Sequence, residues 1–210
     1  MLYLILLLIL IVFGRFAFPI FAFQLTEGYT HTKDLKKYFF RLLIFAIISQ
    51  IPFTLFLLKF TDTFALNIFF QLLFGLLFMA IYDKVNKPLG IFSGIVFAVL
   101  AQLLHFDYGW YGIAIIMIFY LFKNHKALMV SFFIITSIIK YVVPLISFSL
   151  LNIINILFTM NMYSLLCVFT CLSIIFILFY NGKKGKDLKY FLYVFYPAHL
   201  LILYLLDLVI

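Results

Sequence analysis

Long apolar runs separated by short polar connectors make up most of this sequence. A helix that crosses the hydrocarbon core of a bilayer needs about 20 predominantly apolar residues. The pattern predicts eight membrane-spanning helices, at residues 2–25, 38–58, 64–82, 89–104, 109–122, 127–158, 162–180 and 188–208. We therefore expect an all-α fold, a polytopic integral membrane helical bundle that forms a single domain over residues 1–210.

The sixth apolar run is long and contains two residues that disfavour a straight membrane helix. Lys140 places a charge within the run, and Pro144 cannot donate a backbone hydrogen bond. Together they predict a bent or broken element, such as a pair of half-helices. Two full crossings within this run would raise the number of spans from eight to nine.

Basic residues alternate between successive connectors. The connectors at 27–41, 83–87, 123–126 and 181–189 are basic, whereas those at 59–63, at Asp107 and at 159–161 are not. Because cytoplasmic loops carry an excess of Lys and Arg, the basic connectors are expected on the cytoplasmic side. The alternation is consistent only if the sixth run crosses an odd number of times, which predicts eight spans with both termini outside.

Composition excludes a water-soluble domain with a polar shell. The chain is 68% hydrophobic and 10% charged, with a mean hydropathy of +1.26. Its net charge of +8 would suit nucleic-acid binding, but the basic residues cluster in the connectors, so we expect a lipid bilayer and no nucleic acid as partner. Cys167 and Cys171 are expected to be small buried hydrophobic residues. The histidines are too far apart to predict a metal site.

Arg15 is the only charged residue between Met1 and Thr26. A charge at the centre of a membrane helix costs roughly 2.5–3.5 kcal/mol on insertion scales, so such residues are functional candidates by default. Gly14 allows another backbone to approach closely, and Pro19 frees a carbonyl group. The alternative is a structural arginine that pairs with a helix carbonyl or an acid.

His199 is similarly isolated, because residues 190–206 carry no formal charge. It stands two residues after Pro197. An apolar environment disfavours the charged imidazolium, which keeps the imidazole neutral and able to accept a proton. We assign His199 the role of a general base, and the alternative is a histidine that only hydrogen-bonds a neighbouring helix.

Polar residues near the cytoplasmic connectors are candidates for cofactor binding. Arg41 lies about one turn inside the membrane boundary, where it can reach phosphates. In the loop at 180–186, glycines expose backbone amides, and Asn181, Lys183 and Lys184 add polar or positive groups. An ordinary interfacial arginine and an ordinary basic turn are the alternatives. Further candidates for substrate contact or polar support are Glu27, His31, Gln50, Asp107, Tyr111 and Tyr196.

Several short stretches occur in order between about residue 13 and about residue 206. They are Gly14-Arg15-x-Ala17-Phe18-Pro19-x-Phe21-Ala22-Phe23, Glu27-Gly28-Tyr29, Arg41-Leu42, Ser49-Gln50-x-Pro52-Phe53, Tyr108-Gly109-x-Tyr111-Gly112, Tyr180-Asn181-Gly182 and Phe195-Tyr196-Pro197-x-His199-Leu200. In these stretches the chain resembles the TraX family. These integral membrane proteins are named for the conjugative-pilin acetylase and look related to the multispan membrane acyltransferases.

The resemblance implies acetyl transfer from acetyl-CoA in the bacterial inner membrane, in the prototype to the N-terminal amine of a pilin. It makes Arg15 and His199 central, with Glu27, Arg41, Gln50 and Asn181 as supporting positions. Family members usually carry an Asp-His pair in a helix ahead of the Gly-Arg motif, and the thirteen residues before Gly14 contain no such pair. Either the start has been lost or misassigned, or this member lacks the pair and with it the principal catalytic histidine.

The expected mechanism brings the two ends of the chain together. Acetyl-CoA would approach from the cytoplasm, with its phosphates bound by Arg41 and the lysines of the 181–189 loop. His199 would take a proton from an amine or hydroxyl of a peptide, pilin or envelope acceptor, and Arg15 would stabilise the oxyanion at the thioester carbonyl. The alternatives are a membrane transporter, which the lack of an internal repeat disfavours, and a non-enzymatic assembly or immunity partner.

Overall fold

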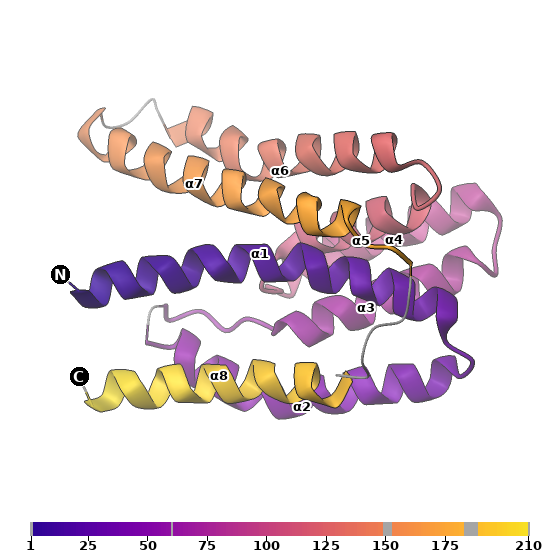
Figure 1. Cartoon of the computed structure of the whole chain (residues 1–210), viewed down its shortest axis with the longest axis horizontal. Coiled ribbons are helices and arrows are strands. Elements are labelled where there is room, and N and C mark those ends of the chain that lie inside the picture. The colour runs from indigo at the N-terminus through magenta and orange to yellow at the C-terminus, as the bar shows by residue number, and fades with distance from the viewer. Residues whose placement is uncertain (1, 60, 149–152, 183–188, 210) are drawn as a thin grey trace. The chain divides into compact units, whose positions relative to one another are not determined.

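The helices of the protein follow the apolar runs of the sequence (Figure 1). A computed structural model describes residues 2–59, 61–148, 153–182 and 189–209. Within these residues the helices are α1 (Leu2–His31), α2 (Leu35–Leu57), α3 (Ile68–Tyr82), α4 (Lys87–Leu103), α5 (Gly109–Leu121), α6 (Lys126–Phe148), α7 (Ile153–Leu178) and α8 (Lys189–Val209). The predicted all-α fold is confirmed, and the described segments contain no strand beyond an isolated bridge between Leu66 and Phe106.

Three of the helices begin at side chains that accept a hydrogen bond from the first turn. Asp34 accepts from the backbone amide of Lys37 at 3.0 Å, and Asn67 accepts from that of Phe69 at 2.9 Å. Asn86 caps α4 in the same way. Because the first amides of a helix have no partner within the helix, these caps explain why α2, α3 and α4 begin where they do.

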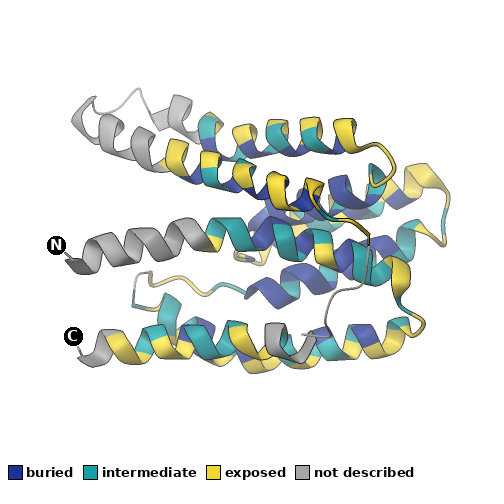
Figure 2. Ribbon diagram, in the orientation of Figure 1, coloured by how far each residue is buried: buried dark blue, intermediate teal, exposed yellow. Residues whose placement is uncertain are grey.

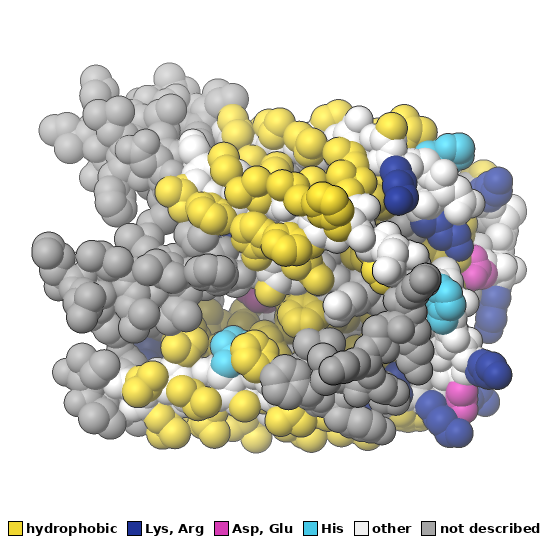
Figure 3. All heavy atoms as spheres, in the orientation of Figure 1, with side chains coloured by type: hydrophobic (Ala, Val, Ile, Leu, Met, Phe, Trp, Pro, Cys, Tyr) yellow, Lys and Arg dark blue, Asp and Glu magenta, His cyan; other side chains and the backbone are white. Residues whose placement is uncertain are grey.

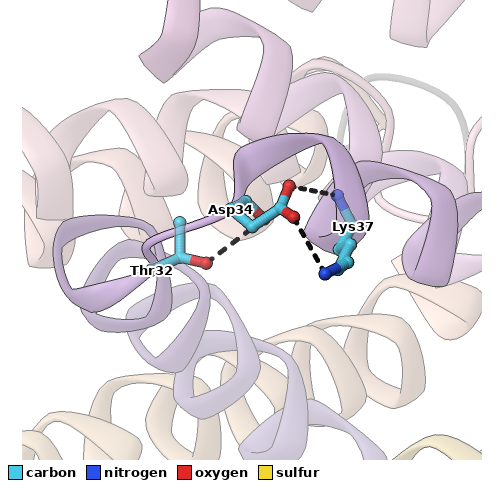
Figure 4. A network of polar contacts seen from close by, with 3 residues as sticks. All are labelled: Thr32, Asp34 and Lys37. Carbon is cyan, nitrogen blue, oxygen red and sulfur yellow. Dashed lines mark hydrogen bonds and ion pairs between the residues drawn. The ribbon is translucent and has the colours of Figure 1, made fainter.

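The turn that connects α1 to α2 is held by a small polar network (Figure 4). The Lys37 ammonium lies 3.3 Å from the Asp34 carboxylate, and the Thr32 hydroxyl donates to the Asp34 carbonyl at 3.5 Å. The backbone amide of Lys37 is the main cause that lowers the pKa of Asp34 below its ordinary value of 3.8. The carboxylate is therefore charged at neutral pH and suited to the positive end of α2.

The predicted bounds 127–158 and 162–180 are wrong. Helix α6 continues through Lys140 and Pro144 to Phe148, so the helix is not interrupted at these two residues, and α7 begins at Ile153 within the same predicted run. A proline inside a helix removes one backbone hydrogen bond without always ending the helix. The predicted connector at 159–161 lies inside α7 instead, because these uncharged residues include neither glycine nor proline to end a helix.

The chain divides into two compact units. The first unit comprises Met1–Glu27 and Ala114–Asn181, and the second comprises Gly28–Ile113 and Gly182–Ile210. In the first unit α6 packs against α7. The free thiols of Cys167 and Cys171 belong to an apolar cluster with Tyr141 and Leu166, as expected of small hydrophobic residues. The prediction of one domain over the whole chain stays a prediction.

In the second unit α3 is the most buried helix and packs against α2 and α4, while α2 also packs against α8 (Figure 2). One face of α2 is buried, with Leu42, Ala46 and Ser49 among its residues. Its opposite face exposes Phe40 and Ile47, which are 58% and 59% accessible. This helix therefore presents an apolar stripe to its surroundings as well as to the core.

Exposed hydrophobic side chains cover much of α7 from Tyr163 onward and, in the second unit, of α8 (Figure 3). Two segments of the described chain, Leu35–Leu57 and Lys126–Val143, are long and apolar enough to cross a membrane. The other apolar helical segments among the described residues are shorter, at 10–17 residues. These properties support association with a membrane.

Helix α3 begins later than predicted, at Ile68 rather than at residue 64, and residues 61–67 before it are not helical. The Asn67 side chain donates to the carbonyl of Ala46 at 2.7 Å. Ala46 lies at the middle of α2, so α3 starts at the level of the middle of α2 and not at its end. The turn before α5 meets the same segment, where Leu66 donates to the His105 carbonyl at 3.0 Å and accepts from the amide of Asp107 at 2.9 Å.

Candidate functional site

A row of aromatic side chains lies between α2, α3 and α8 in the second unit. The rings of Tyr193 and Phe45 are stacked, with centroids 4.9 Å apart and planes inclined by 14°. Phe69 of α3 contacts Tyr193 and meets Tyr196 edge to face at 5.4 Å. The ring of Tyr196 in turn lies 5.5 Å from the imidazole of His199. The row therefore fixes the direction in which the polar groups of α8 point.

Arg41 forms one end of this row. Its Nε donates to the Tyr193 hydroxyl at 3.4 Å, and its guanidinium lies over the rings of Tyr38 and Tyr193, 5.1 and 5.6 Å from their centroids. An arginine uses one N–H for such a bond and retains others for a second partner. The half-buried guanidinium is thus held in place by ring faces and can still bind an anion.

His199 forms the other end of the row. Its Nδ1 lies 3.0 Å from the carbonyl oxygen of Phe195, and its ring stacks on that of Phe195 at 5.2 Å. A carbonyl oxygen only accepts, so Nδ1 carries the hydrogen and a neutral imidazole has its lone pair on Nε2. The bond stays within α8, so His199 does not tie this helix to a neighbour. Its geometry is that of an oriented proton acceptor.

Tyr196 links His199 to the beginning of α3. The backbone amide of Ile68 hydrogen-bonds the Tyr196 hydroxyl, and Asp107 and Tyr108 lie close enough to act on it electrostatically. Tyr196 was predicted as a supporting polar residue, and it is connected to both His199 and Asp107. The phenol thus stands at the positive end of α3 and next to a carboxylate.

Gln50 has a structural role in the same region. Its side chain donates to the Ala65 carbonyl at 2.8 Å and accepts from the amide and the side chain of Asn67 at 3.1 and 2.9 Å. These bonds satisfy the polar backbone of the non-helical segment before α3. Gln50 therefore supports the site by fixing that segment, and Asn67, which the sequence did not single out, is its partner.

Tyr111 is fully buried in the second unit, and its motif forms a close contact between α3 and α5. The amide of Gln71 donates to the carbonyl of Gly109 at 3.2 Å and fills the space beside Gly112. Gly109 adopts a positive φ of 55°, which glycine tolerates best. The Tyr108-Gly109-x-Tyr111-Gly112 stretch thus serves the packing of the site.

The first unit contains another group of predicted residues. Arg15 is half-buried on α1. Glu27 accepts a hydrogen bond from Tyr180, and burial, followed by the charge of Glu27, raises the pKa of Tyr180 above its ordinary value of 10.0. Asn181 follows directly and is exposed. The predicted phosphate-binding turn therefore directly follows Tyr180, whose hydroxyl is bonded to the Glu27 carboxylate.

Three further candidates contribute little defined geometry. His31 is exposed and contacts the Thr30 hydroxyl through Nδ1 at 3.1 Å. Lys183 and Lys184 lie outside the described residues.

Arg15 belongs to the first unit and His199 to the second, so their convergence on one cavity stays a prediction. Within the described ranges of the chain, no group of three His, Cys, Asp or Glu residues could hold a metal ion.

Comparison with known proteins identifies relatives over most of the chain. The TraX protein family model matches residues 1–207. A probable fimbrial assembly protein, FimC of serogroup H1 from Dichelobacter nodosus, is 29% identical over 205 residues, which cover 90% of this chain and 79% of that protein. No solved structure matches. Since the family match extends over nearly every residue, the chain belongs to the TraX family.

Proposed function

We propose that this protein is a membrane-embedded acetyltransferase that moves an acetyl group from acetyl-CoA to an amine or hydroxyl of a peptide or envelope acceptor. The observation that carries the proposal is the Nδ1 contact of His199 with the Phe195 carbonyl at 3.0 Å, which leaves Nε2 as the proton acceptor. The proposal includes a bundle whose eight helices cross the bacterial inner membrane. Exposed apolar faces on α2 and α8 support that environment.

The proposed reaction needs one base and no covalent enzyme intermediate. The Nε2 atom of His199 takes the proton from the acceptor amine or hydroxyl, whose nitrogen or oxygen then bonds to the thioester carbonyl carbon. The carbon–sulfur bond breaks, and the thiolate of coenzyme A leaves and receives a proton. A positioned base of this kind contributes about 10²–10⁴-fold to a rate.

Arg41 is the described residue that best fits the phosphates of acetyl-CoA. Its guanidinium is oriented by Tyr38 and Tyr193 and stands near the cytoplasmic end assigned to α2. Guanidinium groups bind phosphate oxygens through paired N–H donors. Tyr196 would orient His199, and Arg15 keeps its proposed role as the stabiliser of the thioester oxyanion. Asn181, Lys183 and Lys184 keep their proposed role in donor binding.

The name of one relative supports a proposal for the acceptor class. FimC of Dichelobacter nodosus is described as a probable fimbrial assembly protein. We accordingly propose that the acceptor is a pilin or another protein subunit of a surface fibre. This assignment agrees with the pilin acetylation implied by the family resemblance.

Transfer of radiolabelled acetyl groups tests the proposal in membranes that contain the full chain. Label should enter a protein fraction with the wild type and fall to the level of empty membranes with His199→Ala. His125→Ala, at an exposed histidine between α5 and α6, is the matched control and should retain activity. Full activity of His199→Ala would remove His199 from catalysis.

A non-enzymatic assembly partner is the second candidate, because the name of the Dichelobacter nodosus relative describes assembly. Such a partner would promote fibre assembly without consuming acetyl-CoA. It would also tolerate His199→Ala, provided that α2 and α8 still pack. Fibre formation by that variant, together with an absence of acetyl transfer by the wild type, would favour this candidate.

A further inference from the structure

A cavity of about 200 Å³ lies in the first unit, between α1 and the end of α7. Phe23, Phe176, Ile20 and Ile177 supply its apolar walls, and Gln24, Glu27 and Tyr180 supply its polar groups. An engineered cavity of about 150 Å³ is sufficient to bind benzene. The cavity is therefore large enough for a small organic group.

The aromatic walls of the cavity face different directions. The rings of Phe23 and Tyr180 lie 5.5 Å apart with their planes inclined by 79°. Phe176 is held edge to face against Phe16, at 5.7 Å and 76°. The cavity is therefore lined by three aromatic rings, two of which are fixed relative to each other. Aromatic faces carry partial negative charge and attract cations.

Negative charge is concentrated at the polar end of the cavity. Tyr180 donates its hydroxyl to Glu27, and its raised pKa keeps that proton in place at neutral pH. A carboxylate has two oxygens, each of which can accept more than one hydrogen bond. Helix α7 ends at Leu178, and its last carbonyl groups add partial negative charge beside Phe176 and Ile177.

We propose that this cavity binds an ammonium group carried by an apolar molecule, with Glu27 as the counter-ion and Phe23, Phe176 and Tyr180 as the enclosing rings. The described residues of its lining include neither Lys nor Arg, and the Glu27 carboxylate favours a cation over an anion there. The site lies within the first unit and does not depend on the proposed acetyl transfer. A phospholipid headgroup and a free small amine carry the same ammonium group, and the experiment separates them.

Choline is the probe, and its uncharged isostere 3,3-dimethylbutanol is the comparison ligand. Titration of the full chain in non-ionic detergent, followed by saturation-transfer NMR of the ligand, should show choline binding and no saturable binding of the isostere. Glu27→Gln preserves the shape of the side chain and removes its charge, so the Kd for choline should rise by about tenfold or more. Asp62→Asn, at an exposed carboxylate outside the cavity, should leave the Kd unchanged.

Phe23→Leu supplies a second variant that leaves the carboxylate in place and should raise the Kd several-fold. Phe179→Leu is its control, because Phe179 is 83% exposed and does not line the cavity. Equal binding of choline and the isostere, or the same Kd in the wild type and in the folded variants Glu27→Gln and Phe23→Leu, would overturn the proposal. Folding of each variant is checked by size-exclusion chromatography and circular dichroism.

The source of the ammonium group is tested in nanodiscs. Phosphatidylethanolamine should raise the apparent Kd for choline relative to phosphatidylglycerol if the site takes a lipid headgroup. An equal Kd in the two lipids assigns the site to a free amine. Both outcomes are consistent with an ammonium site. If phosphatidylethanolamine raises the Kd for choline, the Glu27→Gln variant must show the same Kd in the two lipids.

Discussion

The Nε atom of Arg41 lies 3.4 Å from the hydroxyl of Tyr193, which joins α2 to α8 at one end of the aromatic row. The same guanidinium rests over the Tyr193 ring, 5.6 Å from its centroid. A hydrogen bond and a cation–π contact with one partner hold the group in a single orientation. Arg41 is consequently better ordered than a lone interfacial arginine, which favours a role in binding an anion.

Arg41→Lys should weaken the binding of acetyl-CoA while leaving the chemical step intact. Lysine retains the charge but loses the planar donor pair and the stacking on tyrosine. We expect the KM for acetyl-CoA to rise about tenfold with little change in kcat, as measured by acetyl transfer at varied donor concentration. Lys87→Ala, at the exposed start of α4, is a control and should leave the KM unchanged.

Tyr196→Phe should destabilise the second unit, because the amide of Ile68 would lose its hydrogen-bond partner. A buried amide left without an acceptor costs about 1–3 kcal/mol. Thermal unfolding in detergent should show a lower midpoint for this variant. Tyr163→Phe, at an exposed tyrosine of α7, should leave the midpoint unchanged, and an unchanged midpoint for Tyr196→Phe would show that the Ile68 bond contributes nothing.

Gly112→Ala should destabilise the contact between α3 and α5. A Cβ atom at this position would lie 2.5 Å from Cδ of Gln71, which is too close. Overpacking of this kind costs about 1–3 kcal/mol, and a lower unfolding midpoint should reveal it. The added change Gln71→Ala should restore part of the loss, and Gly14→Ala is a control because nothing lies within 4 Å of its added Cβ.

The start of α2 should lose stability in acid. The folded pKa of Asp34 lies below its ordinary value of 3.8, so its contribution is present above that pH and is lost as pH falls through the folded pKa. The protection of the Lys37 amide, measured as its exchange rate relative to that of an unstructured amide at the same pH, should fall over this range in the wild type. Asp34→Ala should show less protection at neutral pH and no such step, and a step that persisted would point to another group.

Many of the helices could be placed from the sequence because polar residues bound the apolar runs, and three of these residues, Asp34, Asn67 and Asn86, also serve as caps. Asn67 illustrates how a boundary was misplaced. Residues 64–66 are apolar, yet the helix begins only at Ile68, directly after Asn67, which caps it. The connector at 159–161 failed for the opposite reason, since polar residues without a helix breaker do not end a helix.

The candidate site was predictable only where its contacts are local. His199 bonds to the residue four positions before it in α8, so an oriented imidazole follows from the helical repeat. Tyr193 was missed because its partner Arg41 is 152 residues away in the chain. An ordinary tyrosine in an apolar run carries no signal of such a contact, because only the packing of α2 against α8 creates it.

For the proposed acetyltransferase, the late start of α3 bears on how an acceptor would reach Tyr196. Fifteen helical residues extend about 22 Å, which falls short of a hydrocarbon core about 30 Å thick. In the proposed membrane bundle residues 61–67 would supply the missing length, and their unwound peptide groups would need hydration or internal partners such as Gln50. A water-filled recess at this point would let the hydrophilic end of an acceptor reach the depth of His199 without entering lipid.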